Sequence, residues 1–175
     1  MENILHTPVS VLHTLAALLA VILGTGVVAG RKGTPQHRRA GYAYVGCMLT
    51  VCGTAFGMYH LFGSFGIVHW GALGSLLTLL GGVGAAALKR PAHRWRAWHE
   101  TLMGWSVTGL YAAGLVETTY RIFPPRYFWW ICLGVSSLTF VVGGLLLHRR
   151  RLHGRIRTAR RTNPQENVAV GAVEK

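Results

Sequence analysis

Long uncharged apolar stretches divide the chain into segments of similar length. Four windows contain no Lys, Arg, Asp or Glu, namely 9–29, 40–61, 67–88 and 127–147, and a shorter fifth window covers 101–116. A helix needs about 20 apolar residues to cross about 30 Å of hydrocarbon. The fifth window reaches that length if Glu117 is sheltered inside a bundle. The pattern therefore predicts an all-α fold, a bundle of five transmembrane helices over about 9–30, 40–61, 67–88, 99–120 and 127–147.

Lysine and arginine are concentrated after the first, third and fifth predicted spans, at 31–39, 89–96 and 149–161. The two other connections contribute only Arg121 and Arg126. Because short cytoplasmic loops carry an excess of positive charge, this alternation predicts an N-terminus outside and a C-terminus in the cytoplasm. We expect a multi-pass protein of the bacterial inner membrane, with a membrane domain over 1–148 and a basic, partly disordered cytoplasmic tail over 149–175.

The formal net charge of +13 is accounted for by this orientation signal, so we expect no nucleic-acid partner. The basic tail favours anionic lipid headgroups as its partner. Glycine-rich helix faces also allow a membrane-protein partner or a second copy of the chain. The arginines expected at the lipid surface are Arg149, Arg150, Arg151, Arg155, Arg157, Arg160 and Arg161.

Residues 94–121 contain the polar groups that are hardest to explain by packing alone. His99 and Glu117 are 18 positions apart, which returns them to one helix face about 27 Å apart along the axis. Ser106 lies between them on that face. Arg121 follows Glu117 at the (i, i+4) spacing that allows an ion pair. An ionisable group within a membrane span is a candidate for function by default, so both ends of this face are marked.

The predicted topology gathers ionisable side chains at each membrane surface. No HxxxH or HExxH spacing occurs, so no motif marks a metal site. The prediction of a site depends on how deep these side chains lie in the membrane and on which helix face carries them. We interpret the cysteines, Cys47, Cys52 and Cys132, as small apolar residues. The outer set comprises His13, His60, His69, Glu117 and Arg121, and the inner set comprises His37, His93, His99 and Glu100.

Imidazole suits haem iron, copper or zinc, and the sequence does not decide which of them is bound. Haem b is the best specific hypothesis, because two neutral imidazoles from different helices at equal depth can ligate its iron. His37 with His99 forms an inner pair, and His60 or His13 with His69 an outer one. The leading hypothesis is a small haem b-binding or redox-linked membrane protein. The alternatives are a proton- or cation-linked transporter or sensor subunit using His69 and Glu117, and a non-catalytic assembly partner of a membrane complex. The chain contains no Asp and no nucleophile or phosphate-loop motif, which argues against hydrolytic enzymes.

Three segments carry a family resemblance: KGTPQHRRAGYAYV (32–45), GSFGIVHWGAL (63–73) and WHETLMGWSVTGLYAAGLVETTYRIFP (98–124). They resemble the bacterial membrane proteins grouped as domain of unknown function 2306, over about two-thirds of the chain. The resemblance implies membership of a membrane family but no particular activity. We take His37, His69 and His99 as candidate cofactor-binding residues, and Ser106, Glu117 and Arg121 as structural or proton-linked residues. The polar residues shared with the family are His37, Arg38, Gly41, His69, His99, Ser106, Glu117 and Arg121.

Overall fold

The computed structural model describes residues 8–57 and 66–162, which are helical with short connections and include no strand. The all-α prediction is therefore confirmed for this part of the chain. The predicted residue His60 and the end of the tail, 163–175, lie outside the described residues. The elements in order are α1 (Pro8–Ala29), α2 (Pro35–Phe56), α3 (Ile67–Leu88), α4 (Trp95–Ile122), the 3-10 turn η1 (Pro125–Tyr127) and α5 (Phe128–Thr162).

The second helix begins five residues before its predicted start. Proline at the first helical position needs no N–H partner, and its fixed φ suits the helix, so Pro35 begins α2. Thr34 is the N-cap, and its hydroxyl accepts a hydrogen bond from the backbone N–H of His37 at 3.1 Å. This start places His37 on the first turn of α2.

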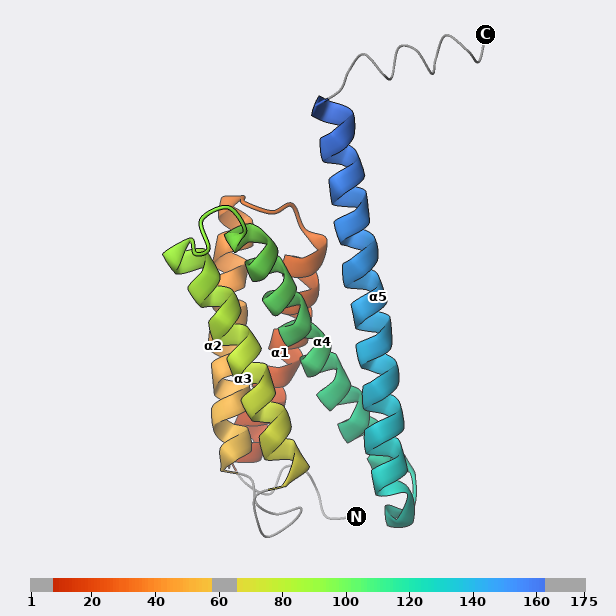
Figure 1. Ribbon diagram of the computed structural model, residues 1–175. Helices are drawn as coiled ribbons and strands as arrows, with labels where there is room; N and C mark the ends of the chain where they lie inside the picture. The colour runs from red at the N-terminus through yellow and green to blue at the C-terminus, as the bar shows by residue number, and fades with distance from the viewer. Residues whose placement is uncertain (1–7, 58–65, 163–175) are drawn as a thin grey trace, which may run out of the picture.

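The fourth and fifth helices are also longer than predicted. α4 begins at Trp95, so the end of the connection predicted over 89–98 is its first turn. α5 continues to Thr162, across the boundary predicted at 148. Arginine is a good helix former, so the loss of apolar character after Leu147 does not end the helix. In Figure 1 α5 extends beyond the ends of the other helices.

Three of the five helices in the described part of the chain are long and apolar enough to cross a membrane. They are α1, α3 and the segment Pro125–Leu152, which includes most of α5. α2 carries Arg38 and Arg39 near its start, and α4 carries charges near both ends. The two helices that fall short are therefore those with charged ends.

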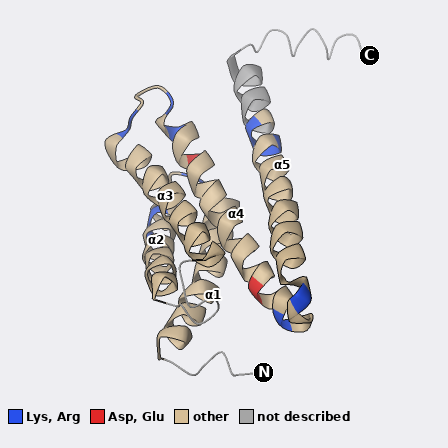
Figure 2. Cartoon of the chain, turned by 60° about the horizontal axis from the view of Figure 1, so that its bottom comes forward, with Lys and Arg blue, Asp and Glu red and all other residues tan. Residues whose placement is uncertain are grey.

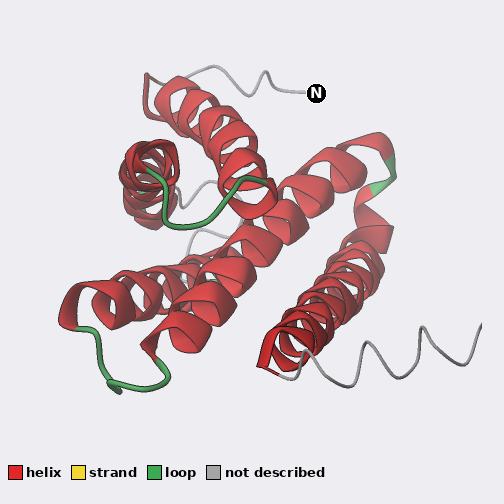
Figure 3. Ribbon diagram, turned by 90° about the horizontal axis from the view of Figure 1, so that it is seen from above, coloured by secondary structure: helices red, strands yellow, loops and turns green. Residues whose placement is uncertain are grey.

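α4 lies at the centre of the assembly and contacts α1, α3 and α5 (Figures 1 and 3). Seen from above, it runs between α5 on one side and the group formed by α1, α2 and α3 on the other. The core at this junction comprises Ala20, Tyr44, Met48, Cys52, Leu79, Met103, Val107 and Leu110.

Glycines allow α4 to approach its neighbours closely. A Cβ on Gly82 of α3 would lie 2.9 Å from Cγ of Met103 and 3.2 Å from its backbone nitrogen. On the other side of α4, a Cβ on Gly104 would meet Leu147, and one on Gly143 would meet Thr108. Small residues at such crossings let two helix backbones pack together. Gly82 of α3 therefore packs closely against α4.

One end of the bundle, which we call the basic end, carries most of the lysine and arginine of the described residues (Figure 2). It includes the connection from Gly30 to Thr34, the connection from Lys89 to Arg94, and Arg149 to Arg151 on α5. The opposite end carries Arg121 and Arg126. The fold thus brings the three basic segments of the sequence to one end.

Candidate functional site

A buried hydrogen bond joins α2 to α4 across the centre of the bundle. The hydroxyls of Tyr44 and Ser106 are 2.9 Å apart, and both residues are fully buried. α2 packs against α1 and α3, and α4 packs against the same two helices, so α2 and α4 are diagonal partners. The side chains of diagonal helices meet in the interior, where a paired hydroxyl avoids the cost of an unsatisfied polar group.

His37 and His99 occupy equivalent positions relative to the hydrogen bond between Tyr44 and Ser106. His37 precedes Tyr44 by seven residues, and His99 precedes Ser106 by seven residues. α2 and α4 run in the same direction (Figure 1). Two helical turns return to nearly the same face after about 10.5 Å of rise. The two histidines therefore lie at similar depth, toward the basic end, on the faces that meet at Tyr44 and Ser106.

The orientation of His99 is fixed by a backbone carbonyl. Its Nδ1 lies 2.8 Å from the carbonyl oxygen of Gly82. Because a carbonyl can only accept, Nδ1 carries the proton, and Nε2 of the neutral ring keeps its lone pair. A histidine that donates one ring N–H to a carbonyl is the usual arrangement for a metal-ligating imidazole. His99 is half-buried on the second turn of α4.

His37 has a buried nitrogen that needs a partner. Its Nδ1 is inaccessible to solvent and has no hydrogen-bond partner among the described residues. Burial, followed by the positive charge of Lys32, lowers the pKa of His37, and Glu100 together with a hydrogen bond to the backbone of Val27 offsets part of this effect. One turn further along α2, a Cβ on Gly41 would meet nothing within 4 Å. The neutral imidazole thus keeps one buried nitrogen without a hydrogen-bond partner among the described residues, and there is open space at Gly41, one turn away.

Two basic side chains, Lys32 and Arg150, donate hydrogen bonds to the C-terminal end of α1, which borders this site. Nζ of Lys32 donates to the carbonyls of Val27 at 2.6 Å and Val28 at 2.9 Å, and Nη1 of Arg150 donates to Val28 at 2.7 Å. These carbonyls belong to the last turn of α1, where no intrahelical donor reaches them. Burial and then the charge of Arg150 lower the pKa of Lys32, and Glu100 offsets part of this effect.

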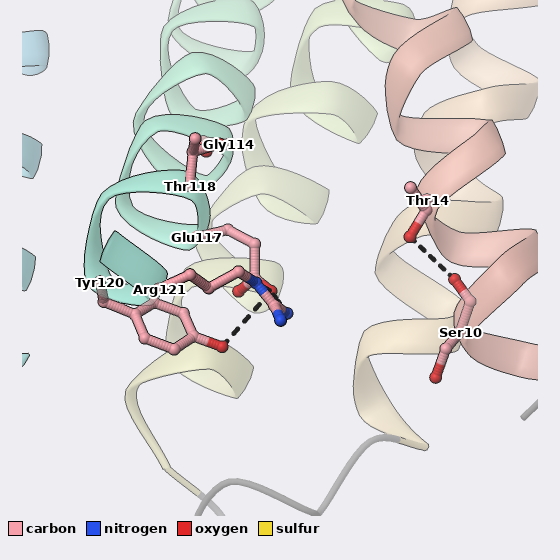
Figure 4. Close-up of polar contacts among 7 residues, drawn as sticks. All are labelled: Ser10, Thr14, Gly114, Glu117, Thr118, Tyr120 and Arg121. Carbon is pink, nitrogen blue, oxygen red and sulfur yellow. Dashed lines mark hydrogen bonds and ion pairs between the residues drawn. The ribbon is translucent and has the colours of Figure 1, made fainter. Parts of the chain in front are cut away.

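At the opposite end, Glu117 is paired within its own helix. Nε of Arg121 donates to Oε1 of Glu117 at 2.9 Å, Nη2 of Arg121 donates to the same oxygen, and the Tyr120 hydroxyl donates to it at 3.4 Å. Figure 4 shows the pair on the side of α4 that faces Ser10 and Thr14 of α1. About half of the Glu117 side chain is exposed, at 49%. The expectation that Glu117 is sheltered is wrong; the expected Glu117–Arg121 pair is confirmed.

The predicted outer histidine pair is not formed by the described residues. His13 lies 2.8 Å from the Thr54 hydroxyl, which itself donates to the Thr50 carbonyl at 2.7 Å. His69 is buried on α3, and its Nδ1 accepts from the Gly66 N–H at 3.1 Å. In the neutral ring of His69 the Nδ1 lone pair is used by this contact, and Nε2 carries the proton. His93, in the basic connection, is exposed.

The geometry reduces the candidate site to two imidazoles. Within 8–57 and 66–162, no group of three His, Cys, Asp or Glu side chains is arranged to hold a metal ion. The three cysteines are free thiols. Sequence reasoning did not identify Gly82 as a partner of His99 or Tyr44 as a partner of Ser106. A backbone carbonyl carries no residue-type signal, and nothing in the sequence favoured Tyr44 over Tyr42, the other tyrosine of α2.

Comparison with known proteins adds no assignment. No protein-family model, curated protein or solved structure matches the chain. The function of the site must therefore be argued from its own chemistry.

Proposed function

We propose that the protein is a small haem b-binding protein of the membrane, in which His37 and His99 would hold the haem iron. The observation that carries this proposal is the state of the two rings. His99 donates Nδ1–H to Gly82 and keeps a lone pair, and His37 has a buried nitrogen without a partner in the described residues. A neutral imidazole with a carbonyl behind it is well suited to ligate iron.

The number of protein ligands favours haem over a bare metal ion. Structural zinc sites use four protein ligands and catalytic ones three, which two histidines cannot supply. Haem brings four nitrogens of its own, so two axial imidazoles complete the coordination of its iron. The chain would contribute the axial ligands from α2 and α4, the orientation of His99 through Gly82, and positive charge at the basic end.

Bound haem of this kind supplies reversible one-electron transfer. The residues of this chain would set how easily the iron is reduced. Lys32 and Arg150, which border the site, would stabilise negative charge near it, and the apolar core beneath it would exclude water. We therefore favour a redox-linked membrane protein over the proton-linked alternative, because Glu117 is neutralised by Arg121 on its own helix.

We also propose that all five helices cross a bacterial inner membrane, with the basic end in the cytoplasm. In its support, α2 and α4 lie alongside the three apolar helices (Figure 1), and the basic segments gather at one end. This orientation would place Arg149 to Arg151 against anionic headgroups. We expect green fluorescent protein fused after Lys175 to fluoresce and alkaline phosphatase fused there to be inactive; active phosphatase would reverse the orientation.

Membership of the domain of unknown function 2306 family fits this proposal. Both histidines of the inner pair, together with Ser106 of the central hydrogen bond, are among the polar positions of the resemblance. The proposal would then extend to relatives that keep the two histidines on helices in the same order.

The test is an absorption spectrum with iron analysis of the full chain, purified in detergent from cells supplied with a haem precursor. We expect a Soret band, an α band that sharpens on reduction, and iron and haem in equal amounts. A colourless, iron-free preparation from cells that load a control cytochrome would overturn the proposal.

A further inference from the structure

A groove runs along the surface between α3 and α4 at the basic end. Its volume is about 250 Å³. Gly81, Gly84, Ala85 and Leu88 of α3 form one wall, Trp98 lies on the α4 side, and Arg90 is part of the lining. The other lining residues are apolar, so Arg90 contributes one positive charge to an apolar groove.

The groove has unfilled space at Gly84. A Cβ built on Gly84 would meet nothing within 4 Å, whereas one on Gly82, which faces α4, would meet Met103. The space above Gly84 is therefore not filled by the protein's own packing. An apolar surface of this kind needs an apolar occupant, because leaving it to water is costly.

The charge near the groove selects an anion. Arg90 is exposed in the connection between α3 and α4, and Trp98 is half-exposed at 50%. The N-terminus of the 28-residue α4 lies at the same end, where the helix dipole is positive and the first turn holds no acidic side chain. Tryptophan and arginine at this level are typical of the headgroup region of a membrane.

We propose that this groove binds one anionic phospholipid, with its phosphate at Arg90 and an acyl chain along the Gly81–Ala85 face of α3. The occupant combines the two chemistries present, an apolar chain and a negative headgroup. This inference does not depend on haem. It rests on the proposed membrane crossing, which the fusion experiment above tests separately.

The experiment counts lipid molecules retained by the full chain in native mass spectrometry after titration with phosphatidylglycerol or phosphatidylcholine. We expect one phosphatidylglycerol to be retained in preference to phosphatidylcholine. Arg90→Gln should reduce that retention about fivefold, because it removes about one surface cation from the headgroup contact. Gly84→Leu should reduce retention of both lipids, because the added side chain fills the groove.

Two variants serve as controls. Gly74→Leu places the same side chain on α3 at another position with open space, outside the groove, and Arg126→Gln removes a cation from the opposite end. Both should retain phosphatidylglycerol as the unmodified protein does, and thermal unfolding should verify that all four variants fold. Equal retention of the two lipids, or equal losses in Gly84→Leu and Gly74→Leu, would overturn the proposal.

Discussion

Replacing His99 with alanine is expected to lower the haem content of the purified protein at least about tenfold, because the change removes an axial ligand. His37→Ala should have a similar effect, since each imidazole completes the coordination begun by the other. The ratio of Soret absorbance to protein absorbance measures the result. The expected loss follows from the register that places both rings two turns from the Tyr44–Ser106 hydrogen bond.

The matched control for this prediction is His93→Ala. His93 lies in the connection before α4, at the same end, but its side chain is exposed. Its removal should leave the haem content unchanged. If His93→Ala lost as much haem as His99→Ala, the effect would come from the basic end in general. Retention of haem by both His37→Ala and His99→Ala would exclude the two residues as ligands.

Gly24→Ala is expected to destabilise the protein by about 1–3 kcal/mol, the usual cost of overpacking a core. The new Cβ would lie 2.9 Å from Cε2 of Tyr44 and 3.2 Å from Cγ2 of Val107. Tyr44 is fully buried and holds Ser106, so its ring cannot move without disturbing the hydrogen bond between α2 and α4. Thermal or denaturant unfolding of the detergent-solubilised protein measures the change.

Gly26→Ala is the control for the stability prediction. It lies two residues away on α1, where a Cβ would meet nothing within 4 Å. The same substitution there should be neutral or slightly stabilising, because alanine favours helix over glycine. Equal destabilisation by the two substitutions would mean that the contact of Gly24 with Tyr44 is not the cause.

The sequence predicted the helices where apolar character and helix boundaries coincide. α3 spans the predicted residues 67–88, because its apolar run ends at Lys89 on one side and begins at Ile67 on the other. The prediction was less accurate where a charged segment is itself helical. Pro35 and the arginines that follow it belong to α2, and those after Leu147 continue α5, so loss of apolar character did not mark a helix end.

The sequence also predicted only part of the candidate site. Depth along each helix follows from counting residues, and this count is the reason why the sequence predicts an inner pair of His37 and His99. The state of each ring depends on acceptors that sequence does not display, such as the Gly82 carbonyl for His99 and the Gly66 N–H for His69. The predicted role of His69 as a cofactor ligand stays a prediction. The family resemblance around His69 gave no indication of its hydrogen bond with the Gly66 N–H.

The electron paramagnetic resonance spectrum of the oxidised, purified full chain tests the central claim most directly, because it reports how many axial ligands the iron has. Two imidazoles, His37 and His99, predict a low-spin ferric signal, which should be lost in His99→Ala. A high-spin signal in the unmodified protein, or no iron signal at all, would contradict the assignment of the two histidines to one haem.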